Sequence, residues 1–212
     1  MRVYKNITIG KVALGNRFLL GFLAISSLVF HSLAAAAAAP TDPLGVTKTA
    51  ATELTSRLTQ DKTVIKEHPE HVEKLVAEVL LPIFDTNRMA KLVLAKNWKK
   101  ATPSQQEAFT LGFEKILIRT YANAFAAFDG QEIVFLTPKF NKDGSKAIVR
   151  SEIKMEGSAS IIVDYRLRYN DSQWMVYDAV IEGVGLVKSY RSQFADVIRQ
   201  KGMAELIASL PS

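Results

Sequence analysis

Two stretches in the second half of the chain alternate between apolar and polar residues with a period of two. In residues 160–169 every odd position is apolar or aromatic, and residues 146–155 alternate in a similar way. Successive side chains of a strand point to opposite faces, so each stretch predicts a strand with one apolar and one solvated face, as in antiparallel sheets. The apolar face must be covered, which requires helices or a second sheet on that side.

The rest of the chain supplies helices. Apolar residues at helical spacing predict helices over 43–60, 69–81, 85–96 and from Pro103 to near Gly130, and two more from Leu186 that Gly202 separates. Further strands are predicted at 131–138 and 173–181. Helices, then strands, then helices predict an α+β fold: a curved antiparallel four-stranded sheet, or cone, packed against several helices with an apolar cavity between.

The first 39 residues have the pattern of a cleaved secretory signal peptide. Basic residues without an acidic one precede the 13-residue apolar run 18–30, and the alanines at 34–39 offer cleavage sites before Pro40. A bilayer span takes about 20 residues, so an uncleaved anchor is the less favoured alternative. We therefore expect one domain over 40–212, with helical parts at 40–130 and 186–212 and the sheet at 131–182, located in a bacterial periplasm.

Charge and cysteine content exclude several classes of function. The chain has 27 basic and 21 acidic residues, but four of the basic ones lie in the predicted signal, which leaves a net charge of about +2. Such a chain is not a natural nucleic-acid partner. It contains no cysteine, which excludes disulfides, thiolate chemistry and a lipidated cysteine.

The inventory of catalytic and cofactor motifs is thin. Beyond the predicted signal the only histidines are His68 and His71, at a charged helix start where a solvated helix end is favoured over a metal site. The sequence has no P-loop, no dinucleotide fingerprint and no nucleophile elbow. We expect no catalytic residue, no metal and no cofactor.

Asp178 is the one carboxylate that suggests an alternative. The alternation places it on the same side of its strand as Val176 and Val180. In an apolar cone it would act as a general base next to a carbonyl, as in isomerases of the ketosteroid type. The favoured interpretation is that Asp178 faces outward or satisfies local backbone groups at the strand–helix junction.

Basic residues on the predicted sheet have two interpretations. Arg150, Arg166 and Arg168 belong by default to a solvated face, and the alternative is a docking surface toward phosphates or an acidic partner. The Trp98-Lys99-Lys100 cluster has the same two interpretations.

Several ordered motifs carry a resemblance to a known family. They are Phe84-Asp85, Met89-Ala90 through Leu94 with Trp98, Thr102-Pro103-x-x-Gln106-x-x-Phe109, Tyr165-Arg166-Leu167, Trp174-x-Val176-Tyr177-Asp178, Ile181-Glu182-Gly183-Val184 with Leu186-Val187, and Tyr190-Arg191-Ser192-Gln193-Phe194. From Pro82 to Leu210 the chain resembles the MlaC, or toluene-tolerance, family of periplasmic phospholipid-binding proteins. It departs from the family at Thr86, Ala95 and Gly185, where the family usually has an aromatic residue, Gly and Ser.

The resemblance implies a nuclear-transport-factor-2-like (NTF2-like) cone that holds acyl chains. It also implies a shuttle that carries phospholipid between an outer-membrane lipoprotein complex and an inner-membrane ABC transporter complex and so maintains outer-membrane lipid asymmetry. Burying two 16-carbon chains gains about 25 kcal/mol gross, which requires a deep apolar cavity. We expect its wall to include Val93, Phe113, Leu117, Tyr121, Val149, Val163, Tyr165 and Ile181. A structural adaptor whose aromatic faces are all core is the third alternative.

Overall fold

The structure is a computed structural model that describes residues 42–211. The described residues all belong to the same compact unit. The predicted signal peptide, residues 1–39, lies outside the described residues. Among those described, no helix is both long enough and apolar enough to cross a membrane.

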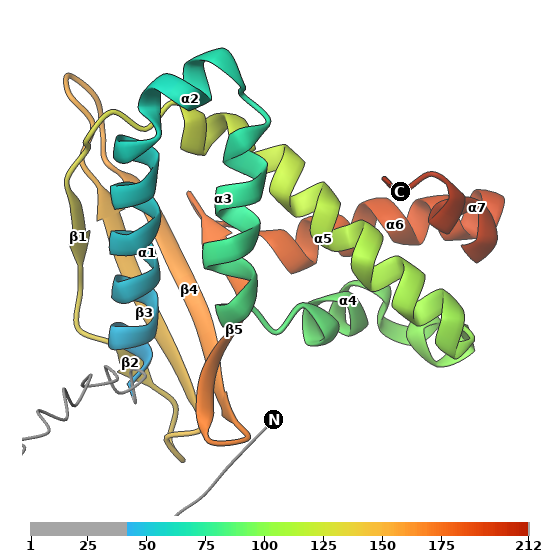
Figure 1. The fold of residues 1–212 in the computed structure, drawn as a ribbon. Coiled ribbons are helices and arrows are strands. Elements are labelled where there is room, and N and C mark those ends of the chain that lie inside the picture. Colours follow the sequence, from blue (N-terminus) through green and yellow to red (C-terminus); the bar gives the residue numbers. More distant parts are fainter. Residues whose placement is uncertain (1–41, 212) are drawn as a thin grey trace, which may run out of the picture. The chain divides into compact units, whose positions relative to one another are not determined.

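The first helices are α1 (Pro43–Gln60), α2 (Lys62–Glu67) and α3 (His71–Leu80). The Asp42 carboxylate accepts a hydrogen bond from the Gly45 amide at 2.8 Å and so fixes the start of α1. The sequence predicted α1 and α3 but missed the short α2, which has a single buried residue and therefore little periodic signal. Figure 1 shows α1 and α3 side by side, with α1 against the sheet.

Two further helices start where capping signals predicted them. After η1 (Leu81–Ile83), Asp85 caps α4 (Thr86–Leu94) by accepting from the Arg88 amide at 3.0 Å. The chain turns at Ala95, with φ 49°, into the 3₁₀ segment η2 (Ala95–Lys100). Thr102 and Gln105 then form a capping box at the start of α5 (Pro103–Ala126).

The described residues form one antiparallel sheet, in the order β1-β3-β4-β5-β6 with β2 also paired to β3. Its strands are β1 (Ile133–Phe135), β2 (Lys139–Phe140), β3 (Lys146–Ile153), β4 (Ile161–Asn170), β5 (Gln173–Ile181) and β6 (Val184–Gly185). Of the predicted strand 131–138 only β1 is formed, and β2 lies just beyond it, where no strand was predicted. Pro138, between the two, has no amide to donate to the ladder. The predicted α+β class with a curved antiparallel sheet is confirmed, while the strand count rises from four to six.

A register shift between Arg166 and Leu167 changes which face β5 presents. On one side of the shift Leu167 pairs with Val176, and on the other Arg166 pairs with Asp178. Adjacent residues of β4 point to opposite faces, so Val176 and Asp178 also lie on opposite faces. The predicted placement of Asp178 on the same side as Val176 is therefore wrong, because the bulge inserts one residue that strict alternation does not contain.

The chain ends in α6 (Leu186–Lys201) and α7 (Met203–Ala208), separated by Gly202 with φ 87°. A Cβ placed on Gly112 of α5 would lie 2.7 Å from Leu210, so only glycine permits this close approach.

Three groups of buried side chains hold the described residues together. One lies between α1 and the sheet and includes Val149, Leu167 and Val176. The second joins α1, α3 and the C-terminal half of α5, and the third joins α4, α6 and α7 to the N-terminal half of α5. Helix α5 therefore contributes to both helical cores, and its central residues lie between them.

Candidate functional site

A groove of about 360 Å³ opens where α5, the end of β5, β6 and the start of α6 meet. We call it the α5–α6 groove. Its lining residues are Thr120, Tyr121, Ile181, Val184, Leu186, Ser189, Tyr190 and Gln193.

None of the residues that line the α5–α6 groove is charged. Three are aliphatic, and the others carry a hydroxyl or an amide. The hydroxyls of Tyr190 and Thr120 lie 3.3 Å apart and join α6 to α5. Neutral donors beside an apolar surface suit a ligand that is mostly hydrocarbon with a few polar oxygens.

Tyr121 supplies a hydroxyl that stays protonated. Burial raises its pKa, and the neighbouring Tyr190 adds to the effect. An unperturbed tyrosine already titrates near pH 10, so Tyr121 is a neutral hydrogen-bond donor at any physiological pH. Tyr121 therefore presents a neutral hydroxyl to the groove.

A tight turn shapes the β6 side of the groove. Glu182 and Gly183 both have positive φ, 49° and 78°, and together reverse the chain between β5 and β6. The Glu182 carboxylate accepts a hydrogen bond from the Ile162 amide of β4, which ties the turn to the sheet. Val184 follows the turn and is 59% exposed, so part of the apolar surface of the groove is in contact with solvent.

Asp178 fixes the start of α6. It is only 4% exposed, and its Oδ1 accepts from the Val187 amide at 3.1 Å. Its Oδ2 lies 3.1 Å from Nη1 of Arg166. Gly185 occupies the N-cap of α6 without a capping side chain, and Asp178 provides that bond from the sheet.

This arrangement agrees with the favoured interpretation of Asp178 as a junction residue, although its side chain is buried and does not face outward. Both carboxylate oxygens are engaged, and Asp178 is not among the groove residues. No feature of its surroundings supports the role of a general base in the cavity.

The eight residues predicted to contact acyl chains fall into three places. Tyr121 and Ile181 line the groove, and Val163 is the cross-strand partner of Ile181. Val93, Phe113 and Leu117 belong to the core of α4, α5, α6 and α7, and Val149 and Tyr165 belong to the α1–sheet core. Their role in binding stays a prediction.

Sequence reasoning missed the polar part of the groove, formed by Thr120, Ser189, Tyr190 and Gln193. On α6 the spacing of Leu186, Ser189, Tyr190 and Gln193 is helical, so these four share one side. The helical spacing alone could have placed these residues on one side of α6. The side mixes apolar and polar residues, however, so it does not form the apolar stripe from which buried helix faces are predicted.

The two histidines face different carboxylates. Nδ1 of His68 lies 3.3 Å from Glu70, and Nε2 of His71 lies 2.7 Å from Asp61. Within residues 42–211 no group of three or more His, Asp or Glu side chains is arranged to hold a metal ion. The two pairs are local links where α2 and α3 meet.

The three arginines of the sheet are matched with partners. Arg150 makes two bonds to Asp164, at 2.6 and 2.8 Å, and these hold the pKa of the Asp164 carboxyl below its usual range. Arg166 pairs with Asp178, as described above. Arg168 donates to Asn170 at 3.0 Å and lies 3.8 Å from a carboxylate oxygen of Asp85. Each of the three thus has a carboxylate nearby, on the sheet for Arg150 and Arg166 and at the start of α4 for Arg168.

The chain is similar in sequence to a family of proteins and to two relatives that have been described. The family model described as MlaC protein matches residues 48–212. The toluene tolerance protein ttg2D of Pseudomonas putida is 29% identical over 174 residues, which cover 82% of this chain and 79% of the relative. The intermembrane phospholipid transport system binding protein MlaC of Haemophilus influenzae is 25% identical over 177 residues, covering 82% and 83%.

A solved structure gives the same result. It is described as the phospholipid-binding protein from Ralstonia solanacearum in complex with a phospholipid, and it matches with a TM-score of 0.73 at 31% identity. The match covers 79% of this chain and 93% of the other. These findings confirm the resemblance that the sequence motifs indicated.

Proposed function

Because the chain belongs to the MlaC family, we propose that it binds a phospholipid through the α5–α6 groove and carries it between membranes as a diffusing shuttle. The observation that carries the proposal is the composition of the groove: neutral hydroxyls and an amide beside an aliphatic surface. A lipid's glycerol and ester oxygens would meet the hydroxyls while its acyl chains leave water. The charged headgroup would stay at the entrance, because an unpaired buried phosphate is prohibitively costly.

The acyl chains must extend beyond the groove. Ligand pockets have volumes of about 300–1,000 Å³, so 360 Å³ is at the small end of that range. Phe113, Leu117 and Tyr121 are spaced by four residues along one side of α5, and this side leads from the groove into the core of α4, α5, α6 and α7. We propose that the acyl chains follow this side of α5.

Tyr190 is placed to control that route. It lines the groove, and its ring makes an edge contact with the ring of Phe113, with centroids 5.3 Å apart. Moving the Tyr190 side chain would join the groove to the apolar core behind it. The Tyr190 ring also contacts the ring of Phe194, with centroids 5.6 Å apart. Entry of the lipid would thus replace two aromatic contacts with many contacts between methylenes and side chains.

The cellular part of the proposal follows from the family. We propose that residues 1–39 are removed on export, and that the remaining chain moves phospholipid in the periplasm between an outer-membrane lipoprotein complex and an inner-membrane ABC transporter complex. This transport would maintain outer-membrane lipid asymmetry. Sequencing the N-terminus of the exported protein tests the first step, with a start near Pro40 as the expected result.

Extraction of lipid from the protein purified from the periplasm tests the binding. Organic extraction and mass spectrometry should recover about one phospholipid per protein molecule. Recovery of no lipid, together with no uptake from vesicles by the folded protein, would contradict the proposal.

A pair of variants on one helix tests the groove itself. Ser189→Trp places an indole in the groove, whereas Ser192→Trp places the same indole at an exposed position of α6 outside it. The first variant should lose most of its lipid and the second should retain it, with both folded by circular dichroism. Equal lipid contents would show that the lipid binds elsewhere.

A further inference from the structure

The segment formed by α4 and η2 concentrates positive charge. Between Asp85 and Glu107 the chain contains five basic residues and no acidic one. Four of them are exposed: Lys91, Lys96, Lys99 and Lys100. We call these four the α4–η2 lysine face.

The lysines of this face are not neutralised by neighbouring carboxylates. In the part of the chain that the structure describes, none of the four forms an ion pair. Helix α6 adds another cation, because Arg191 donates from Nε to the Leu92 carbonyl at 2.8 Å. The chain beyond residue 39 has 23 basic and 21 acidic residues, so the excess charge is local and not a property of the whole surface.

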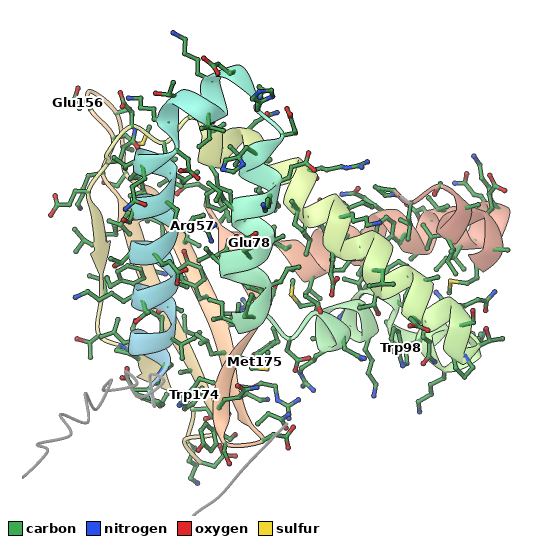
Figure 2. The ribbon with its side chains drawn as sticks, in the orientation of Figure 1. Arg57, Glu78, Trp98, Glu156, Trp174 and Met175 are labelled. Atoms are coloured by element: carbon green, nitrogen blue, oxygen red, sulfur yellow. The ribbon has the colours of Figure 1, made fainter. Side chains whose placement is uncertain are left out.

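The segment is held in a defined shape. A 3₁₀ turn has three residues, so Lys96 and Lys99 lie on the same side of η2. The Trp98 side chain packs partly against the core of α4, α5, α6 and α7, and its carbonyl accepts from Nε2 of Gln106 at 2.8 Å. Figure 2 labels Trp98 close to the N-terminal end of α5, well separated from the sheet residue Trp174. Lys96 and Lys99 are thus presented side by side near the N-terminal end of α5, with Lys100 next in the chain and Lys91 on the preceding helix.

We propose that the α4–η2 lysine face docks on the surface of a bilayer that contains anionic phospholipid. The charge is supplied by lysines, whose compact ammonium groups suit a diffuse negative field, whereas a site for single carboxylates or phosphates favours the planar fork of arginine. A bilayer of anionic lipid provides such a field, and clusters of four or more basic residues are the usual sequence signature of binding to it. Trp98, an amphipathic side chain at the same place, suits the headgroup level of that surface.

The docking is expected to be reversible. The four lysines attract the surface through water, without an apolar segment that inserts into the bilayer. Each lysine is expected to contribute about fivefold to the partition coefficient at low ionic strength, and three together about 100-fold. Docking goes beyond phospholipid binding in the α5–α6 groove and does not depend on it.

Co-sedimentation with vesicles tests the proposal. The exported protein is mixed with vesicles that contain about one quarter phosphatidylglycerol in phosphatidylcholine, or phosphatidylcholine alone, and the sedimented fraction is measured. Binding should require phosphatidylglycerol and should disappear in about 0.5 M salt. Equal binding to both vesicle types would overturn the proposal.

Matched triple variants assign the binding to the face. Replacing Lys96, Lys99 and Lys100 with Gln should lower the partition coefficient about 100-fold at low ionic strength, as expected when about fivefold is lost per lysine. The same replacement at Lys139, Lys142 and Lys146, which are also exposed but lie around the β2–β3 turn, should change it less than twofold. Equal losses, or no loss from the first triple, would show that the α4–η2 lysine face is not the docking surface.

A groove variant separates this inference from the proposed function. Ser189→Trp should still bind phosphatidylglycerol vesicles while it loses bound lipid. If vesicle binding is lost with the lipid, sedimentation reports uptake into the groove and docking by the lysines is contradicted. The α4–η2 triple variant should show the opposite result: it should keep its bound lipid and lose vesicle binding. That result would support docking by the lysine face and lipid binding in the groove as separate properties.

Discussion

The α1–sheet core and the α5–α6 groove are both apolar, yet they are built differently. In the α1–sheet core Val149, Leu167 and Val176 have no measurable exposure. In the groove Ile181 is half-buried, Val184 is exposed, and hydroxyls lie beside them. The first interface is filled by its own side chains, whereas the second is left partly open.

This difference separates residues that hold the fold from residues that meet a ligand. A filled interface loses stability when a methylene is removed, because a cavity remains. An open groove already tolerates missing contacts, so changes there should affect binding more than folding. Four variants test this contrast, and the one with the greatest predicted effect comes first.

Leu167→Ala should cause the largest loss of stability. Truncating a fully buried leucine costs about 2–5 kcal/mol, because apolar burial is lost and a cavity forms. Urea unfolding of the lipid-free protein measures the loss. The folded fraction should still bind one lipid, and a loss of lipid binding without a loss of stability would contradict the division between the two regions.

Asp178→Asn should have the next largest effect. It removes the charge from the bonds to the Val187 amide and to Arg166, and hydrogen bonds to charged groups are worth about 1.5–3 kcal/mol each at most. We expect a loss of about 1–2 kcal/mol, measured by urea unfolding. Lipid content per folded molecule should be unchanged, whereas a stable variant that had lost turnover on a carbonyl substrate would favour the isomerase alternative.

Tyr121→Phe should leave the fold intact and weaken binding. The change removes one hydroxyl from the groove, and a neutral hydrogen bond contributes about 0.5–1.5 kcal/mol, or a twofold to tenfold change in affinity. Unfolding free energy should shift by less than about 0.5 kcal/mol. Tyr169→Phe, an exposed tyrosine at the end of β4, is the matched control and should bind lipid normally.

Arg150→Gln should give the smallest effect, and one that depends on pH. The Arg150 guanidinium lowers the pKa of Asp164, so this pair adds stability above the unfolded-state pKa of about 3.9. The contribution is lost as pH falls through the lowered folded-state pKa. Urea unfolding of both proteins should therefore differ at pH 7 and converge in acid, and a difference independent of pH would contradict the pairing.

Local signals in the sequence predicted the helix starts and the sheet well. Asp85, Thr102 and Pro103 predict helix starts without knowledge of the fold, because a capping side chain accepts from an amide only two or three residues further along the chain. The alternation over β3 and most of β4 is equally local. These are the parts of the structure for which a short window contains the physical cause.

The bulge and the groove depend on contacts that no short window contains. A one-residue register shift is decided by pairing between strands, so the face of Asp178 was predicted wrongly. The groove mixes polar residues of α5 and α6 that meet only in the folded chain. Six of the eight predicted wall residues do not line it, because apolar character alone does not distinguish a packed core from the wall of a binding site.

The bulge also determines which kinds of mutation β5 can accept. On one side of it Trp174 and Val176 face α1, and on the other Asp178 and Val180 face the start of α6. Removal of Tyr177, the extra residue of the bulge, would make Val176 and Asp178 neighbours in a regular strand, paired as now with Leu167 and Arg166. Adjacent residues point to opposite faces, so Asp178 would keep its place at the start of α6. Tyr177 is therefore a position in β5 at which the loss of one residue preserves both faces of the strand.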